Sequence, residues 1–167
     1  MSLNLVLLGG SGFLGQAVLR QLQAGSGDCQ VHCLVHPFVR VHHGQLESLP
    51  ADVLPEEPHV VIHCASKQVD HDGTGFGSNL RGIERLLARL TPQTRGIVYV
   101  SSFSVYGDGA QVAIDEGSPL RPHTPLARSR AECEQRLLAH ASTACPVTIL
   151  RARFVVGEGD QHFLPGL

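Results

Sequence analysis

The alternation of apolar and polar residues near the N-terminus predicts a buried strand, a tight turn and a helix. Leu5 to Leu8 form an uninterrupted apolar run, which is typical of a parallel strand covered on both faces. A glycine-rich turn follows. Apolar residues then return at the spacing of one helical face, at Phe13, Leu14, Ala17, Val18 and Leu22. This start predicts a β-strand joined to an amphipathic α-helix.

The same alternation continues along the chain. Further strands are predicted over residues 30–35, 38–42, 59–66, 96–100 and 147–150, and further helices over residues 76–90 and 127–140. Strands that alternate with helices favour an α/β fold with a doubly wound parallel sheet, a Rossmann fold with strand order 3-2-1-4-5-6. The 167 residues suffice for one core, so we assign residues 1–167 to a single domain.

The three glycines of the first turn each suit a dinucleotide site. Gly9 permits the turn, Gly12 lets backbone N–H groups approach a pyrophosphate, and Gly15 allows the helix to pack closely on the strand. The N-terminus of the helix adds a partial positive charge. The spacing G-x-x-G-x-x-G differs from the commoner G-x-G-x-x-G, and a plain strand-to-helix connection is the alternative interpretation.

The residues after the second predicted strand bear on which dinucleotide would bind. An Asp or Glu there accepts hydrogen bonds from the adenosine ribose of NAD, whereas a basic residue accepts the 2′-phosphate of NADP. No carboxylate lies between Val35 and Arg40, and the missing charged hydrogen bond is worth roughly 1.5–3 kcal/mol. His36 and Arg40 would suit a phosphate, which favours NADP over NAD. The alternative is that both are solvated loop residues.

The carboxyl ends of two later strands carry candidate site residues. Cys64, Ala65 and Ser66 are small, and small residues at this end of a strand leave room for a ligand to cross the sheet edge. Ser101 and Ser102 follow the fifth strand, where hydroxyl groups are well placed to bind a substrate or its carbonyl. The alternative for the two serines is an ordinary serine-rich turn.

Two clusters carry residue types that bind metals, but neither predicts a metal site. Helical ligand spacing is found at Cys29, His32, Cys33 and His36. The surrounding β-favouring residues predict a strand instead, on which the cysteines and the histidines point to opposite sides. A second cluster, Asp70, His71 and Asp72, lies in a glycine-rich segment and is interpreted as a solvated loop.

Composition excludes several classes of partner. The chain is 43% hydrophobic and 17% charged with a formal net charge of −2, so no nucleic-acid partner is expected. Its apolar runs are far shorter than a membrane span and its start lacks the basic flank of a signal peptide, so no membrane association is expected. Five cysteines without framework spacing indicate reduced thiols and a cytoplasmic location.

Taken together, five segments resemble the extended short-chain dehydrogenase/reductase group, the NAD-dependent epimerases and dehydratases. In chain order they are residues 9–15, 61–65, 79–82 with 86–87, 100–107, and 150–151 with 156–160. Glu116, Pro119 and Pro122 match the family's loop before the last segment. The resemblance implies a Rossmann fold that binds NAD or NADP. It implies cofactor contacts for Gly9, Gly12, Phe13, Leu14, Gly15, His36, Arg40, Leu46, Cys64, Ala65, Ser66, Ser101 and Arg130. It also implies a homodimer paired through the helices near residues 76–90 and 127–140, and leaves the small-molecule substrate unknown.

The sequence departs from this family at its catalytic Tyr-x-x-x-Lys. Leu126 stands where the tyrosine is expected and Arg130 where the lysine is expected. No shift of alignment restores the pair, because Lys67 is the sole lysine. The tyrosine normally exchanges a proton with the substrate while the lysine lowers its pKa. Leucine has no proton to exchange, although arginine can still bind ribose hydroxyls. Losing a positioned acid–base group costs typically about 100- to 10,000-fold in rate.

Three hypotheses for the function follow. The first is an NAD(P)-binding relative of epimerases, dehydratases and reductases whose ordinary acid–base catalysis is lost or much reduced. The second is an active enzyme in which Ser102 polarises the substrate carbonyl and Tyr106 replaces the missing proton donor. The third is a cofactor-free scaffold or regulatory protein. The family's substrate-binding region is expected after the last matching segment, so we expect a truncation or a reduced fold.

Overall fold

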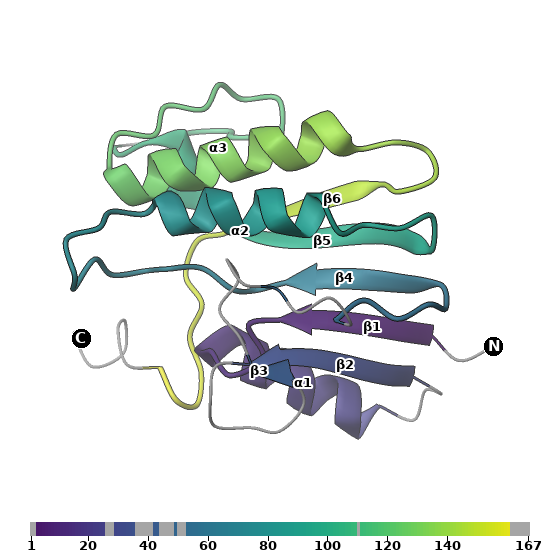
Figure 1. The fold of residues 1–167 in the computed structure, drawn as a ribbon. Coiled ribbons are helices and arrows are strands. Elements are labelled where there is room, and N and C mark those ends of the chain that lie inside the picture. The colour runs from purple at the N-terminus through teal and green to yellow at the C-terminus, as the bar shows by residue number, and fades with distance from the viewer. Residues whose placement is uncertain are drawn as a thin grey trace.

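The computed structural model describes residues 3–25, 29–35, 42–43, 49, 53–109 and 111–160. Its centre is a parallel sheet of six strands in the order β3-β2-β1-β4-β5-β6 (Figure 1). The strands are β1 (Leu3–Leu8), β2 (Cys29–Val35), β3 (His42–His43), β4 (His59–His63), β5 (Thr94–Ser102) and β6 (Val147–Ala152). The predicted fold class and strand order are confirmed.

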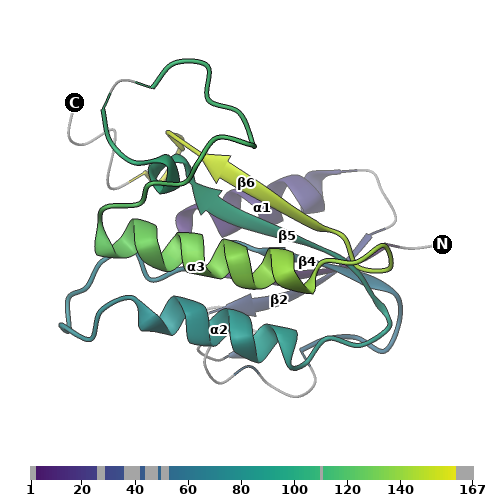
Figure 2. The same ribbon diagram turned by 90° about the horizontal axis from the view of Figure 1, so that it is seen from above.

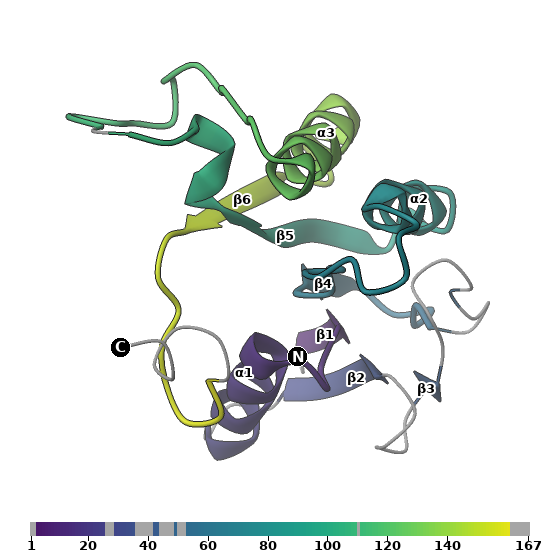
Figure 3. The same ribbon diagram turned by 90° about the vertical axis from the view of Figure 1, so that its left-hand side faces the viewer.

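The helices cover both faces of the sheet, as a doubly wound fold requires. They are α1 (Phe13–Ala24), α2 (Gly77–Leu87) and α3 (Pro125–His140), and a short 3₁₀ turn, η2, covers Phe103–Tyr106. Figure 3 shows α1 on one face and α2 with α3 on the other, and Figure 2 shows α2 and α3 side by side. In the described part of the chain, no helix is long and apolar enough to cross a membrane.

The apolar run of β1 explains why both faces need cover. Val6 and Leu8 are buried in the larger core cluster, under α2 and α3. Leu7 points to the opposite face, where it packs with residues of α1 that include Val18 and Leu19. Because successive side chains of a strand point to opposite faces, an apolar residue at every position requires a helix layer on each side.

Several predicted boundaries shift for local reasons. Helix α3 begins at Pro125, two residues before the predicted start, because the Thr124 hydroxyl accepts a hydrogen bond from the Ala127 N–H at 3.1 Å. Strand β4 ends at His63, so Cys64 to Ser66 belong to the following loop. Of the predicted third strand only His42 is among the described residues, and β3 continues from it to His43.

The strand prediction for the first cysteine–histidine cluster is confirmed. Strand β2 covers Cys29–Val35 and pairs in parallel with β1 along its length. The four-residue metal site would have required a helix here, so that interpretation is excluded for the three cluster residues in the strand. His36 lies outside the described residues.

Candidate functional site

The first glycine turn joins β1 to α1 and lies directly against the end of β4. Gly9 has a φ of +85°, a conformation that side chains strongly disfavour, and a Cβ there would lie 2.6 Å from the Ala65 nitrogen. A Cβ on Gly15 would lie 2.0 Å from the Gly9 carbonyl oxygen. The turn itself therefore requires glycine at both positions, since no side chain fits.

Gly12 is different, because the turn leaves space beside it. It is the N-cap of α1, with a φ of −75° that any residue can adopt, and its N–H donates to the Gly9 carbonyl at 3.1 Å. The nearest atom to a Cβ built on Gly12 is that carbonyl oxygen, at 3.4 Å. No side chain caps the helix and its first turn carries no acidic residue. The cradle at this helix N-terminus therefore fits a pyrophosphate.

The loop after β4 extends this cradle along the sheet edge. The Cys64 N–H donates to the Leu8 carbonyl at 2.9 Å, which continues the pairing of β4 with β1 by one residue. Ala65 then lies against Gly9, and the Ser66 hydroxyl donates to the Lys67 carbonyl at 3.4 Å. The structure thus brings together Gly9 and Ala65, two of the residues predicted to contact the cofactor. They meet between β1 and β4, where the strand order of the sheet reverses.

A segment beyond β6 borders the same edge. Figure 1 shows it in yellow, running from the end of β6 past the arrowheads of the strands toward α1. Cβ atoms built on Gly157 and Gly159 would lie 4.0 Å and 3.9 Å from the Phe13 ring. Arg153, at the start of this segment, lies over the Phe103 ring at 5.2 Å. The carboxyl edge is therefore lined from η2 to the start of α1.

The two serines at the end of β5 have separate roles. The Ser102 side chain caps η2 by accepting a hydrogen bond from the Ser104 N–H at 3.2 Å, and it is partly exposed. Ser101 is buried, and its hydroxyl donates to the Glu134 carboxylate on α3. Of these two serines, Ser102 is therefore the accessible one, while Ser101 contributes its side chain to the interior.

Glu134 and Arg151 form a buried ion pair behind the edge. The Glu134 side chain is 1% exposed and that of Arg151 16% exposed, and the Arg151 Nη2 donates to the Glu134 carboxylate at 2.8 Å. This hydrogen bond raises the pKa of the Arg151 guanidinium. Arg151 also donates to the Tyr106 hydroxyl, which in turn donates to the Asp115 carbonyl at 2.9 Å. The predicted substitute proton donor is thus held in a structural network.

Leu126 and Arg130 lie one turn apart near the start of α3. The Leu126 side chain is partly buried. The Arg130 Nη2 donates to the Gln68 side-chain oxygen at 2.5 Å, and its Nε is buried with no hydrogen-bond partner among the described residues. Burial lowers the pKa of the Arg130 guanidinium. An arginine is therefore held beside the loop after β4, where it can present its outer N–H groups to a ligand.

Sequence reasoning gave no role to His63, which ends β4. Both of its ring nitrogens are buried without a hydrogen-bond partner among the described residues, and its ring packs edge-on against Tyr99 at 5.3 Å. Burial lowers the pKa of His63 to about 4, so the ring is neutral at neutral pH. The only sequence signal was a histidine at the end of an apolar run.

Some predicted residues remain untested. His36, Arg40 and Leu46 lie outside the described residues, so their predicted contacts with the dinucleotide stay predictions.

In the second candidate metal cluster, the Asp70 and Asp72 carboxylates form ion pairs with the Lys67 amine at 2.7 Å and 2.5 Å. Within the described ranges, no three His, Cys, Asp or Glu side chains are placed to hold a metal ion.

Comparisons with known proteins relate this arrangement to a family of enzymes. The model of the NAD dependent epimerase/dehydratase family matches residues 5–167. The chain is 27% identical over 186 residues to a 2-alkyl-3-oxoalkanoate reductase of Stenotrophomonas maltophilia, covering 99% of this chain and 54% of the relative. It is 28% identical over 164 residues to a dTDP-glucose 4,6-dehydratase of Streptomyces griseus, covering 84% of this chain and 50% of the relative.

Solved structures share the fold. A short-chain dehydrogenase/reductase superfamily protein of Agrobacterium tumefaciens, solved with NAD, has a TM-score of 0.77 at 24% identity over 89% of this chain and 48% of its own. A dTDP-glucose 4,6-dehydratase of Streptomyces venezuelae, also with NAD, has a TM-score of 0.74 at 26% identity over 89% of this chain and 55% of its own. This chain spans about half the length of the curated relatives it matches. With the glycine turn, the strand order and the family model in agreement, the chain belongs to the NAD dependent epimerase/dehydratase family.

Proposed function

We propose that this chain binds a nicotinamide dinucleotide along the carboxyl edge of its sheet, with the family's ordinary Tyr/Lys acid–base catalysis lost or much reduced. The observation that carries the proposal is the turn itself. Gly9 and Gly15 leave no room for a side chain, whereas Gly12 has open space beside it at the N-terminus of α1. A strand-to-helix connection that binds nothing would explain the glycines at Gly9 and Gly15, where the packing is close. It would not explain a glycine at Gly12.

The proposed contacts follow from this geometry. The N–H groups at the start of α1 would hold the pyrophosphate, and Ala65 would lie under the part of the dinucleotide that crosses from β1 to β4. Arg130 would donate hydrogen bonds to the ribose hydroxyls. The family's lysine would do the same at this position, and a permanently charged arginine can still do it. When bound, the nicotinamide ring supplies the capacity to accept or donate a hydride.

Thermal unfolding with each dinucleotide tests the binding. Because His36 and Arg40 suit a phosphate, we expect NADPH to raise the melting temperature more than NADH. At about one hundred times its dissociation constant, a ligand stabilises the fold by about 2.7 kcal/mol, or roughly 5–10 °C here. Calorimetry or a dye can report unfolding, since the chain lacks tryptophan. No shift with either dinucleotide at millimolar concentration would reject the proposal and favour the cofactor-free scaffold.

For the substrate, we propose only a chemical class. Two of the matching relatives are a 2-alkyl-3-oxoalkanoate reductase and a dTDP-glucose 4,6-dehydratase. Small ketones and sugar nucleotides therefore form the first substrate panel. Ser102 is the accessible one of the two serines at the end of β5 and is proposed to bind the substrate carbonyl.

Restoring the missing pair tests the loss of acid–base catalysis. In Leu126→Tyr with Arg130→Lys, the new phenol lies one helical turn from an ammonium group, so its pKa should fall below the ordinary value of about 10. Absorbance of the tyrosinate band measures this directly against a background of two tyrosines. With a substrate from the panel, we expect turnover to rise by about 100-fold or more.

Leu138→Tyr is the matched control, because Leu138 is on the same helix, 48% exposed and remote from the edge. Its phenol should titrate near the ordinary value and add no turnover. A wild-type protein that already turns over as fast as the restored variant would reject lost catalysis and favour the Ser102 and Tyr106 route. In that case, Tyr106 would be the next residue to replace.

A further inference from the structure

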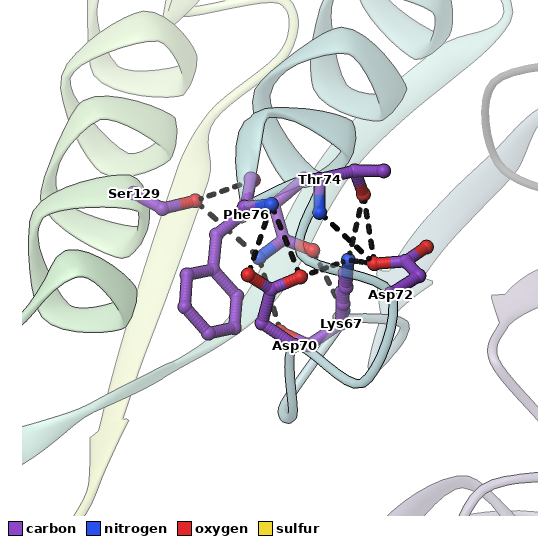
Figure 4. A network of polar contacts seen from close by, with 8 residues as sticks. Lys67, Asp70, Asp72, Thr74, Phe76 and Ser129 are labelled. Carbon is purple, nitrogen blue, oxygen red and sulfur yellow. Dashed lines mark hydrogen bonds and ion pairs between the residues drawn. The ribbon is translucent and has the colours of Figure 1, made fainter.

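The sole lysine of the chain is bound within the loop that follows β4. The Lys67 Nζ donates to Asp70 at 2.7 Å, to Asp72 at 2.5 Å and to the Thr74 hydroxyl at 2.9 Å (Figure 4). The hydrogen bonds to Asp70 and Asp72 raise the pKa of the Lys67 amine. An ammonium group has three protons, so all three N–H donors of the Lys67 side chain are used inside the loop.

The two carboxylates also bind the backbone of the loop. Asp70 accepts from the Gly75 N–H at 3.0 Å, and Asp72 accepts from the Thr74 N–H at 3.2 Å. The loop is therefore closed around the lysine by both side-chain and backbone contacts. Removing Lys67 would leave the two carboxylates facing each other without a cation.

Asn79 joins this loop to α3. Its side-chain oxygen accepts from the Lys67 N–H at 2.7 Å, and its amide nitrogen donates to the Lys67 carbonyl at 3.2 Å and to the Ser129 hydroxyl at 3.3 Å. Ser129 donates in turn to the Phe76 carbonyl at 3.0 Å. The backbone of Lys67 is thus fixed relative to the residue that precedes Arg130.

The same short loop contacts both the glycine turn and Arg130, the two parts of the chain that are proposed to bind the dinucleotide. Ala65 lies against Gly9 of the glycine turn, and Gln68, three residues later, accepts the hydrogen bond from Arg130. Lys67 lies between these two contacts. A loop held at its centre therefore sets the distance and direction from the glycine turn to the guanidinium.

We propose that Gln68 is a positioning residue for the dinucleotide, and that Lys67 fastens the loop that presents it. Gln68 holds one Nη of Arg130, and because a guanidinium is planar this fixes where its other N–H groups point. A lysine at position 130 has no such plane to orient. The inference rests on the proposed binding of a dinucleotide, and it gives the lone lysine a role other than that of the missing catalytic lysine.

Gln68→Leu tests the positioning role. We expect it to weaken NADH or NADPH binding, measured by titration of the nucleotide fluorescence, by about threefold to tenfold with an unchanged melting temperature. Gln68→Glu keeps the acceptor oxygen and should keep the affinity. Gln93→Leu is the matched control, since Gln93 accepts from Arg95 at 3.4 Å in the connection before β5, at the opposite end of the sheet.

A double replacement separates positioning from direct contact. In an Arg130→Ala background, Gln68→Leu should cause no further loss of affinity. Unchanged affinity in the single variant, or an equal loss in both backgrounds, would overturn the proposal. Failure of the underlying function is distinguishable, because the wild-type protein would then bind neither dinucleotide.

Lys67→Met tests the fastening role. Backbone hydrogen exchange in residues 66–76 should become faster, and dinucleotide affinity should fall to the level of Gln68→Leu. Combining the two replacements should add little to either. Slow exchange retained in Lys67→Met, or affinity losses that add in the double variant, would show that Lys67 does not act through Gln68.

Discussion

Replacing Arg151 with methionine should lower the free energy of unfolding by about 3–5 kcal/mol, the range found when one partner of a buried ion pair is removed. The variant leaves the Glu134 carboxylate buried, with an exposed fraction of 1%, and without its cation. Ser101 continues to donate to Glu134, but one hydroxyl cannot replace a guanidinium. Urea denaturation followed by circular dichroism measures the loss.

An exposed ion pair provides the control. Arg136 donates to Glu84 at 2.8 Å between α3 and α2, with the two side chains 56% and 44% exposed. Arg136→Met should therefore cost less than about 1 kcal/mol. Replacing both members of the buried pair, Glu134→Leu with Arg151→Met, should recover part of the loss, because no unpaired charge remains inside. Equal effects of the two single replacements would contradict the burial argument.

Replacing Gly15 with alanine should disrupt the glycine turn and reduce dinucleotide affinity by more than tenfold (~1.4 kcal/mol or more). The added Cβ would lie 2.0 Å from the Gly9 carbonyl oxygen, so the helix or the turn must move. We expect a lower melting temperature, and a thermal shift that needs more than tenfold higher NADH or NADPH than in the wild-type protein. Both are read in one thermal-shift titration.

Gly12→Ala separates the fold from the function. Its Cβ would meet only the Gly9 carbonyl at 3.4 Å, so the melting temperature should change little while dinucleotide affinity falls. Gly25→Ala is the control, since Gly25 has a φ of −68° at the end of α1 and its Cβ would lie 3.5 Å from the nearest atom. Alanine there should be neutral or slightly stabilising. Normal affinity in Gly12→Ala would argue against a pyrophosphate at this turn.

The strand and helix order was predictable because it depends on local patterns. The apolar run of β1 requires two covering layers, and the glycines after it permit a tight turn into a helix. The strand predicted for the cysteine–histidine cluster was confirmed for the same reason, since the β-favouring residues around it form β2 over Cys29–Val35. Boundaries were less certain, because a cap such as Thr124 can extend a helix by two residues.

The use of each polar side chain was not predictable in the same way. Ser101 and Ser102 are neighbours in the sequence, yet the first donates to a buried carboxylate and the second caps a turn at the edge. Tyr106 was a candidate proton donor by its motif, but its hydroxyl is shared between Arg151 and a backbone carbonyl. Adjacent positions of a strand face opposite layers, and their partners come from distant segments.

The sequence by itself determined the doubly wound sheet and the glycine turn. These follow from periodicity, conformational freedom and residue identity, which need no partner elsewhere in the chain. Only the tertiary structure decided that Lys67 closes a loop on itself and that Gln68 contacts Arg130, 62 positions away. Such contacts depend on how helices and loops pack across the sheet edge, and no local pattern encodes them.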